Sequence, residues 1–108
     1  MDEELKMVHE IDNLETIREG KVLVDFYTET CGPCKTMAPV LEEVSEQFSN
    51  VKFAKVELTR NPMASQMFGV MSVPTVMFLQ DSQVKEVQRG LSINMKEDLK
   101  SMVQKHLN

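Results

Sequence analysis

The chain has no tryptophan, and only two of its 108 residues are cysteine. Two cysteines are too few for the disulfide framework of a small secreted scaffold. No stretch approaches the roughly 18 consecutive apolar residues that a membrane span requires. The first residues, Met1 to Glu4, are acidic and lack the basic-then-apolar pattern of a secretory signal peptide. We therefore expect a protein of the cytoplasm that does not associate with membranes.

Basic residues are also in deficit, because 12 Lys and Arg stand against 17 Asp and Glu, a formal net charge of −5. A negative chain is repelled by nucleic acid and by anionic membrane surfaces, so neither is an expected partner. The sequence contains no repeat, low-complexity run, linker, or nucleotide- or flavin-binding motif, so we expect no cofactor. Its length and its 42% apolar content predict one globular domain over residues 1–108, present as a monomer.

The spacing of apolar residues predicts strands that alternate with helices. We expect strands at residues 7–10, 22–27, 51–58 and 75–79, and a hairpin partner at 84–89 after a turn at Asp81-Ser82. Helices are expected up to Arg18 after a cap at Asp12 or Asn13, and at residues 33–48, 62–68 and 95–107. This order predicts an α/β fold with a mixed, mostly parallel sheet of about five strands flanked by about four helices.

Two residue types qualify this picture. Pro39 lies inside the helix expected at 33–48 and should bend it, because the apolar spacing continues beyond the proline. Nine methionines are many for this length, and most, such as Met67, Met77 and Met102, are expected to fill the core. Met37 and Met71 are instead candidates for a soft surface that suits varied protein partners.

Both cysteines belong to one motif, Cys31-Gly32-Pro33-Cys34, which follows the buried strand at 22–27 and opens the helix after it. Disulfide exchange needs a thiolate, and the free N–H groups and dipole of a helix N-terminus favour negative charge at Cys31. Cys34 lies one turn further along the same face, where it can attack a mixed disulfide formed at Cys31. The motif therefore predicts an exposed nucleophile, Cys31, and a buried resolving thiol, Cys34.

The residues between the cysteines favour a reductant over an oxidant. Gly32 and Pro33 offer no charged or imidazole donor to stabilise the thiolate, and therefore the reduced form is not strongly favoured. A zinc site is the structural alternative, but zinc needs four ligands and only His9 and His106 could join the two thiols. Each histidine is alone near a chain end, and we expect no metal.

Taken together, several motifs resemble those of the thioredoxin family. These are Val24-Asp25-Phe26, Cys31-Gly32-Pro33-Cys34-Lys35, Ala38-Pro39, Val73-Pro74-Thr75 and Gly90. The likeness runs from about residue 7 to 107 in the family's order and spacing. It implies a thioredoxin fold and a protein-disulfide reductase that acts on disulfide-containing proteins. It also implies that a thioredoxin reductase-type flavoprotein supplies the electrons.

Asp25 interrupts an otherwise apolar strand, so it should be protonated or partnered if it is buried. On the sequence alone it could be an accident at a strand end or a functional buried acid. The resemblance favours an acid behind Cys34 that takes up its proton, with Lys55 beside it as a charge partner. Lys55 by itself would be interpreted as a solvated strand residue.

The resemblance also implies a substrate-binding groove. Most X-Pro bonds are trans, but the family carries a cis proline at the position of Pro74, which would leave the Val73 backbone free to pair with an extended substrate. Gly90 is either a site of close backbone approach or a turn that ends a strand. The full set of expected substrate-binding residues is Thr30, Gly32, Pro33, Met71, Ser72, Val73, Pro74, Gly90 and Leu91.

Three positions depart from the family pattern. Thr30 and Tyr27 stand where tryptophans are usual, and Thr59 replaces an aspartate that is usual near the second ring. A smaller, more polar rim at position 30 should weaken generic apolar docking. We therefore expect a disulfide reductant with Cys31 and Cys34 as its redox pair. The alternatives are a binding module built on the thioredoxin fold, a pathway-specific redox partner with a narrowed substrate range, and a metal chaperone.

Overall fold

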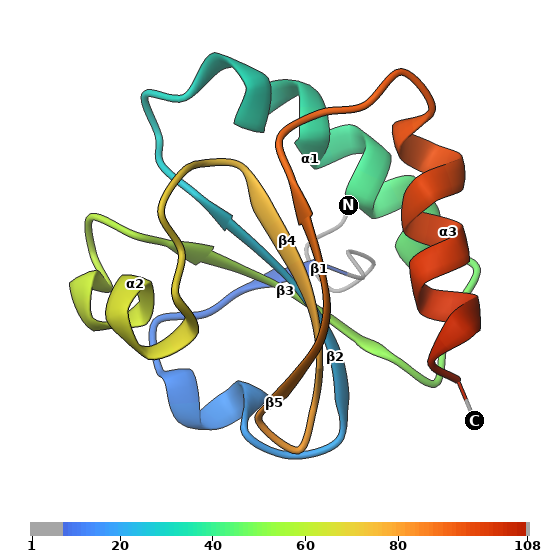
Figure 1. Cartoon of the computed structure of the whole chain (residues 1–108), viewed down its shortest axis with the longest axis horizontal. Helices are drawn as coiled ribbons and strands as arrows, with labels where there is room; N and C mark the ends of the chain where they lie inside the picture. Colours follow the sequence, from blue (N-terminus) through green and yellow to red (C-terminus); the bar gives the residue numbers. More distant parts are fainter. Residues whose placement is uncertain (1–7, 108) are drawn as a thin grey trace, which may run out of the picture.

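The computed structural model describes residues 8–107, so Met7 and the acidic segment 1–4 lie outside the described residues. Strands and helices alternate along the chain in the order that the sequence predicts (Figure 1). The elements are β1 (Val8–Glu10), the 3₁₀ helix η2 (Leu14–Ile17), β2 (Lys21–Tyr27), α1 (Gly32–Ser45), β3 (Lys52–Glu57), α2 (Pro62–Phe68), β4 (Thr75–Gln80), β5 (Gln83–Arg89) and α3 (Met95–Lys105).

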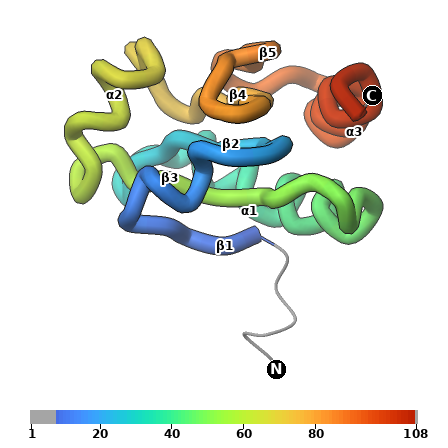
Figure 2. Tube along the Cα trace, turned by 90° about the horizontal axis from the view of Figure 1, so that it is seen from below, coloured from blue at the N-terminus to red at the C-terminus, as the bar shows by residue number. Residues whose placement is uncertain are grey.

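The five strands form one sheet in the order β1-β3-β2-β4-β5, which Figure 2 shows from below. β3 pairs in parallel with β1 and β2, whereas β4 pairs antiparallel with β2 and β5. The mixed sheet is as expected, and its antiparallel part includes the β2–β4 pair as well as the late hairpin. The long central strands β2 and β3 therefore end at the same edge, where α1 begins.

Helices cover both faces of the sheet, and each face has its own apolar core. On one face α1 and α3 pack against side chains that include Leu23, Phe53 and Phe78. On the other face η2 and α2 pack against a set that includes Val24 and Val56. Side chains alternate between faces along a strand, so Asp25, which follows Val24, points towards α1.

Two expectations about methionines are wrong. Met37 is fully buried, because it shares the inner face of α1 with Leu41 and Val44. Met67 is 58% exposed, because the short helix α2 buries Ala64 and turns Met67 outward. Met77 and the other predicted core methionine, Met102, are buried as expected.

Helix α1 ends at Ser45, three residues before the predicted end. Phe48 completes the apolar spacing from the turn that follows the helix, where the Phe48 N–H donates to the Ser45 carbonyl, and it remains buried. Pro39 lies within the helix, as predicted. At the first helix, Asn13 rather than Asp12 is the N-cap, and its side chain accepts the Glu15 N–H at 2.9 Å.

A two-residue turn joins β4 to β5. Asp81 and Ser82 both have positive φ angles, 51° and 72°, as a type I′ hairpin turn requires. The pairing is interrupted by a register shift at Phe78 and Leu79, and β5 forms an edge of the sheet with largely exposed side chains. The register shift and the exposed side chains distinguish β5 from the buried strand β4 beside it.

None of the helices within residues 8–107 is both long enough and apolar enough to span a membrane.

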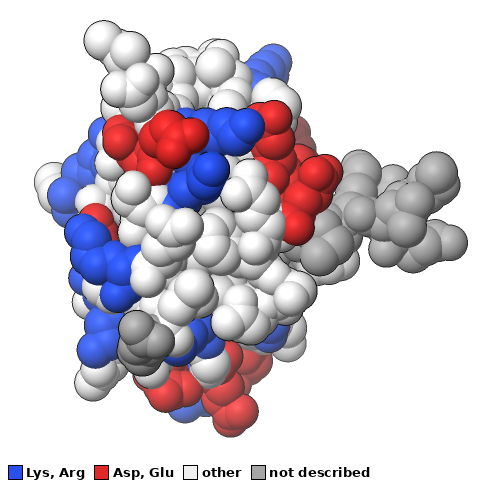
Figure 3. Space-filling model, turned by 90° about the vertical axis from the view of Figure 1, so that its right-hand side faces the viewer, with Lys and Arg blue, Asp and Glu red and all other residues white. Residues whose placement is uncertain are grey.

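On the face shown in Figure 3, acidic and basic side chains are interspersed and separated by wide uncharged areas. One ion pair, between Lys96 and Glu43 at 3.2 Å, joins α3 to α1.

Candidate functional site

Cys31 and Cys34 form a disulfide at the start of α1, with their Cα atoms 5.3 Å apart. Cys31 is the N-cap of the helix, and its sulfur accepts the Cys34 N–H at 3.1 Å. Cys31 is partly exposed, whereas Cys34 is only 4% exposed. The two cysteines therefore differ in exposure, and Cys31 is the more exposed of the pair, as the sequence predicts.

The local sequence explains this placement. β2 ends at Tyr27, and the Cys31 N–H donates to the Thr28 carbonyl at 3.3 Å, which turns the chain into the helix. Pro33 occupies the first helical turn, where its missing N–H costs nothing because that donor would lack a partner inside the helix. Both Gly32 and Pro33 are exposed beside the disulfide.

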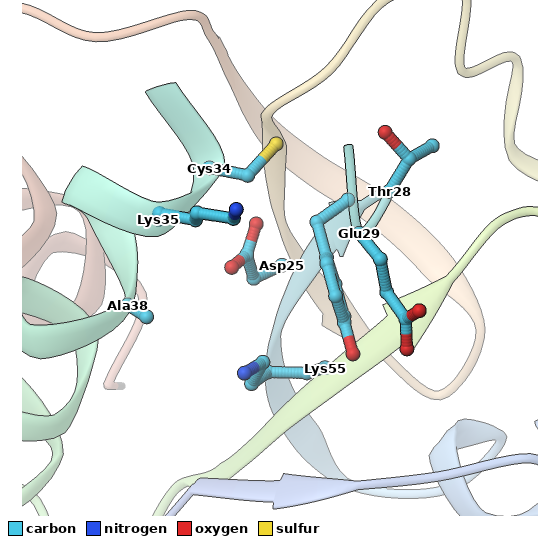
Figure 4. A pocket seen from close by; sticks show the side chains of 8 residues that line it. Asp25, Thr28, Glu29, Cys34, Lys35, Ala38 and Lys55 are labelled. Carbon is cyan, nitrogen blue, oxygen red and sulfur yellow. The ribbon is translucent and has the colours of Figure 1, made fainter. Parts of the chain in front are cut away.

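A pocket of about 170 Å³ lies behind Cys34. In Figure 4 the side chain of Asp25 lies between those of Cys34 and Lys55, and all three line the pocket. The residues lining it come from β2, the loop after β2, α1 and β3, and they are Asp25, Tyr27, Thr28, Glu29, Cys34, Lys35, Ala38 and Lys55. The structure therefore brings together the expected resolving thiol, the expected acid and the expected cation.

Asp25 is buried and poorly satisfied. Its side chain is 1% exposed, and within residues 8–107 its Oδ1 atom has no hydrogen-bond partner. Burial raises the pKa of Asp25 to about 7, although the positive charge of Lys55 acts in the opposite direction. Asp25 can therefore gain or lose a proton near neutral pH.

Lys55 is the register partner of Asp25 across the β2–β3 pairing. Its ammonium nitrogen lies 4.8 Å from the centroid of the Tyr27 ring. Among the described residues no ion pair joins Lys55 to Asp25 within 4.0 Å, so Lys55 acts on the carboxyl from a distance.

Glu57 is a site residue that the sequence reasoning missed. It lies at the end of β3 and is 1% exposed. Its carboxylate accepts the Thr59 hydroxyl at 2.5 Å, the Arg60 N–H at 2.9 Å and the Glu29 N–H at 3.1 Å. The Thr59 hydrogen bond, helped by the two backbone donors, lowers the pKa of Glu57 despite burial. Through Glu29, this carboxylate holds the loop that leads to Cys31.

Arg60 forms a second, more exposed link around the same loop. Its guanidinium pairs with Glu29 at 2.9 Å and with Glu10, and it lies 3.6 Å from Asp12. Glu10 also accepts the hydroxyl of Tyr27. Arg60 thus connects two residues of the pocket wall, Tyr27 through Glu10 and Glu29 directly.

The expected groove residues lie on separate loops of the chain. The Val73–Pro74 bond is cis, as the resemblance implies. Met71 is 92% exposed and Leu91 is 41% exposed, while Thr30 and Ser72 are also exposed and Pro74 is buried.

Gly90 ends β5 with a φ angle of 74°, and its N–H donates to the Pro74 carbonyl at 2.8 Å. A side chain at position 90 would meet no atom within 4 Å. The positive φ angle of the turn therefore explains the glycine at position 90, and close packing against other residues of the chain does not.

The two histidines lie apart from the disulfide. His9 is exposed on β1, and the His106 ring stacks on Phe78 and contacts Glu86 at 2.8 Å. Among residues 8–107 no three His, Cys, Asp or Glu side chains are grouped so that they could hold a metal ion. The Thr59 hydroxyl, at the position where the family usually has an aspartate, donates to the Glu57 carboxylate.

Comparison with known proteins agrees with this geometry. The thioredoxin family model matches residues 6–105. A thioredoxin of Chlamydia muridarum is 35% identical over 102 residues, which cover 94% of this chain and 98% of that protein. A thioredoxin of Bacillus subtilis is 42% identical over 90 residues, which cover 82% and 85% of the two chains. The solved structure of a Malassezia sympodialis thioredoxin superposes with a TM-score of 0.83 at 26% identity, covering 94% of this chain and 91% of that one.

Proposed function

Because the chain belongs to the thioredoxin family and is a thiol–disulfide oxidoreductase that reduces protein disulfides, we propose that Cys31 is its nucleophile and Cys34 its resolving thiol. The observation that carries this assignment is the unequal exposure of two disulfide-bonded cysteines at one helix N-terminus. The exposed sulfur can reach a partner protein, and the covered one can reach only its neighbour.

The reaction proceeds in two exchanges. The Cys31 thiolate attacks one sulfur of a target disulfide, which forms a mixed disulfide and releases the other target sulfur as a thiolate. Cys34 then loses its proton, and its thiolate attacks the Cys31 sulfur, which breaks the mixed disulfide and releases the second target thiolate. The target disulfide has gained two electrons, and Cys31 and Cys34 are left as a disulfide. The released target thiolates take up protons from solvent.

Asp25 is the acceptor for the Cys34 proton. It lines the same pocket as Cys34, is nearly inaccessible to bulk water, and has a pKa of about 7 because of its burial. A base with this pKa is matched to proton transfer at neutral pH. Lys55, in the same pocket, favours the carboxylate form of Asp25, which is the form that accepts the proton.

Substrates bind along an extended rim around Cys31. An extended target segment pairs with the Val73 backbone. Val73 lies outside the helices and strands, and among the described residues its N–H and C=O form no backbone hydrogen bond there. The exposed side chains of Met71 and Leu91 supply apolar contact on either side. The other contributors are Thr30, Gly32, Pro33, Ser72, Pro74 and Gly90. Because Thr30 is small and polar, the range of targets is narrower than a large aromatic residue would allow.

The wider setting follows from the same chemistry. The chain works as one monomeric domain over residues 1–108 in the cytoplasm, where its negative charge keeps it away from nucleic acid and membranes. A thioredoxin reductase-type flavoprotein returns two electrons to the Cys31–Cys34 disulfide, and no resident cofactor is required.

Reduction of insulin disulfides with dithiothreitol as the electron source tests the assignment of the cysteines. The wild-type chain should accelerate the reaction, Cys31→Ser should abolish the acceleration, and the surface control Ser101→Ala should leave it unchanged. Full activity of Cys31→Ser would end the assignment. Cys34→Ser should accumulate a covalent complex with target proteins, because the resolving step is missing.

The role of Asp25 requires a separate measurement. The rate of insulin reduction should change with pH around an apparent pKa near 7 in the wild-type chain. This inflection should disappear in Asp25→Asn, which cannot take up the Cys34 proton. An unchanged pH–rate profile would remove Asp25 from the mechanism.

A further inference from the structure

Lys55 lies between two neighbours on one face of the sheet. The β2–β3 pairing sets Asp25 beside Lys55 and Tyr27 beside Glu57, and side chains two residues apart on a strand share a face. The Lys55 ammonium is therefore within reach of both the Asp25 carboxyl and the Tyr27 ring. In the structure it lies over the ring at 4.8 Å, and Asp25 Oδ1 is left without a hydrogen-bond partner.

The Tyr27 ring is held in place from its outer end. Its hydroxyl donates to Glu10, which is paired with Arg60. Burial, together with the hydrogen bond to Glu10, raises the pKa of Tyr27 above its ordinary value, so this donor stays protonated. The ring face is consequently a fixed surface for the flexible Lys55 side chain.

We propose that Tyr27 is a positioning residue whose ring holds the Lys55 ammonium inside the pocket that Lys55 shares with Asp25, and so sets how strongly Lys55 favours the Asp25 carboxylate. The attraction of a cation to an aromatic face keeps the ammonium at this place. Without the ring, the strongly hydrated ammonium on its flexible four-carbon chain extends into water and its effect on Asp25 weakens. In this role Tyr27 acts on Asp25 through Lys55.

The other groups that face Asp25 do not substitute for Lys55. α1 contributes Lys35, which is exposed, and Cys34, which is bonded to Cys31 in the oxidised state. The loop after β2 contributes Glu29, whose carboxylate is paired with Arg60. On β4 the register partner of Asp25 is Val76, which carries no charge. Lys55 is thus the partly buried cation of the pocket.

The proton affinity of Asp25 can be measured directly by carbon-13 NMR titration of its carboxyl in the full-length, oxidised protein. Tyr27→Leu removes the ring and should raise the pKa of Asp25 by roughly half a unit, which matches the strength of a partly exposed cation–π contact. Tyr27→Phe keeps the ring and removes the hydroxyl, so it should leave the pKa near the wild-type value. Lys55→Met should raise the pKa at least as far as Tyr27→Leu does.

The double variant decides whether Tyr27 acts through Lys55. In the Lys55→Met background, Tyr27→Leu should produce no further rise, because the ammonium that the ring holds is gone. An equal rise in both backgrounds, or no rise in either, would overturn the proposal. A second readout does not depend on the leucine variant folding. The ε-methylene protons of Lys55 should show an upfield ring-current shift in the wild-type chain, and their appearance at the position typical of a free lysine would equally overturn it.

The inference rests on the proposed role of Asp25 only for its effect on turnover, and the two can fail separately. A moved carboxyl titration in Tyr27→Leu with an unmoved pH–rate profile would support the positioning role and contradict the proton-acceptor role. An unmoved titration would contradict the positioning role whatever the rate profile does.

Discussion

Asp25 and Glu57 lie on the neighbouring strands β2 and β3, and each side chain is only 1% exposed. Their surroundings differ in the supply of hydrogen-bond donors, and the Asp25 carboxyl also lies deeper than that of Glu57. Glu57 accepts three hydrogen bonds, and its pKa is lowered, whereas Asp25 has an oxygen without a partner and its pKa is raised to about 7. Burial alone therefore does not decide the charge of a carboxyl group, because local donors can reverse its effect.

The difference also separates two functions. Glu57 is a permanent anion that fixes the backbone of Glu29, two residues before Cys31. Asp25 is a group that can change its protonation state near neutral pH, next to the thiol that must lose a proton. Hydrogen-bond donors like those around Glu57 would stabilise the Asp25 carboxylate and lower its pKa. Asp25 could then no longer accept a proton at neutral pH.

Removing the ionisable group from the poorly satisfied site should have the largest effect. The folded protein binds the Asp25 proton more tightly than the unfolded chain does, so the contribution of Asp25 to stability falls as pH rises from about 4 to about 7. Asp25→Asn should remove this dependence and be more stable than the wild type at pH 8 by up to roughly 4 kcal/mol, from a shift of about three pKa units at 1.36 kcal/mol each. Urea unfolding of the oxidised proteins at several pH values measures this. Equal urea midpoints at pH 8 would contradict the comparison.

The opposite change at the satisfied site should destabilise the protein. Glu57→Gln replaces an acceptor of two backbone N–H groups and a hydroxyl with a side chain that must turn an NH₂ group towards one of them. The melting temperature should fall by about 5 °C or more at pH 7. A lowered pKa adds stability that is present above pH 4.5 and is lost as pH falls through the folded-state value, so the difference should narrow in acid. The exposed Glu46→Gln variant is the control, and a loss of similar size there would remove the special role of Glu57.

Removing a single hydrogen-bond donor from Glu57 should change its pKa and the stability of the protein by a smaller amount. Thr59→Val keeps the side-chain shape but deletes the hydroxyl that donates to Glu57 at 2.5 Å. The pKa of Glu57 should rise towards its ordinary value, and the melting temperature should fall by roughly a few degrees. NMR titration of the Glu57 carboxyl checks the first result, with the exposed Thr36→Val variant as control. An unmoved titration would show that the backbone donors suffice.

A variant at Arg60 can distinguish the contribution of the buried Glu57 carboxylate to stability from that of the exposed ion pairs around it. Arg60→Met keeps the backbone N–H that donates to Glu57 but deletes the ion pairs with Glu10, Asp12 and Glu29. These carboxylate side chains are 40–75% exposed, so the melting temperature should fall by no more than about 2 °C, and the difference should vanish in high salt. Thermal melts at low and high salt test this, and a loss larger than that of Thr59→Val would contradict the ranking.

The sequence contained enough to predict most of the fold. The strand expected at 22–27, the helix expected at 62–68 and the turn expected at Asp81-Ser82 are all confirmed. Errors arose where a local pattern gave no information about neighbours. The apolar spacing of α1 continues to Phe48 although the helix ends at Ser45, because a residue in the following turn can also reach the core.

The site shows the same division. The cysteine motif and the acid in a buried strand identified Cys31, Cys34 and Asp25 as candidates, since each stands out from its immediate surroundings. Glu57 could not be found in this way, because a glutamate at the end of an alternating strand looks like a solvated residue. Its partners come from the turn that follows it and from a loop 28 residues earlier, and only the folded chain brings them together.

Strand β5 has a consequence for how the protein behaves among its own copies. An unpaired outer strand is a template on which further chains can add, and a flat apolar one would invite fibre growth. Here the pairing is irregular at Phe78 and Leu79, and the strand carries Lys85, Glu86 and Arg89. Such an outer strand resists stacking, so a crowded solution of this electron carrier should stay dispersed while its molecules collide with other proteins.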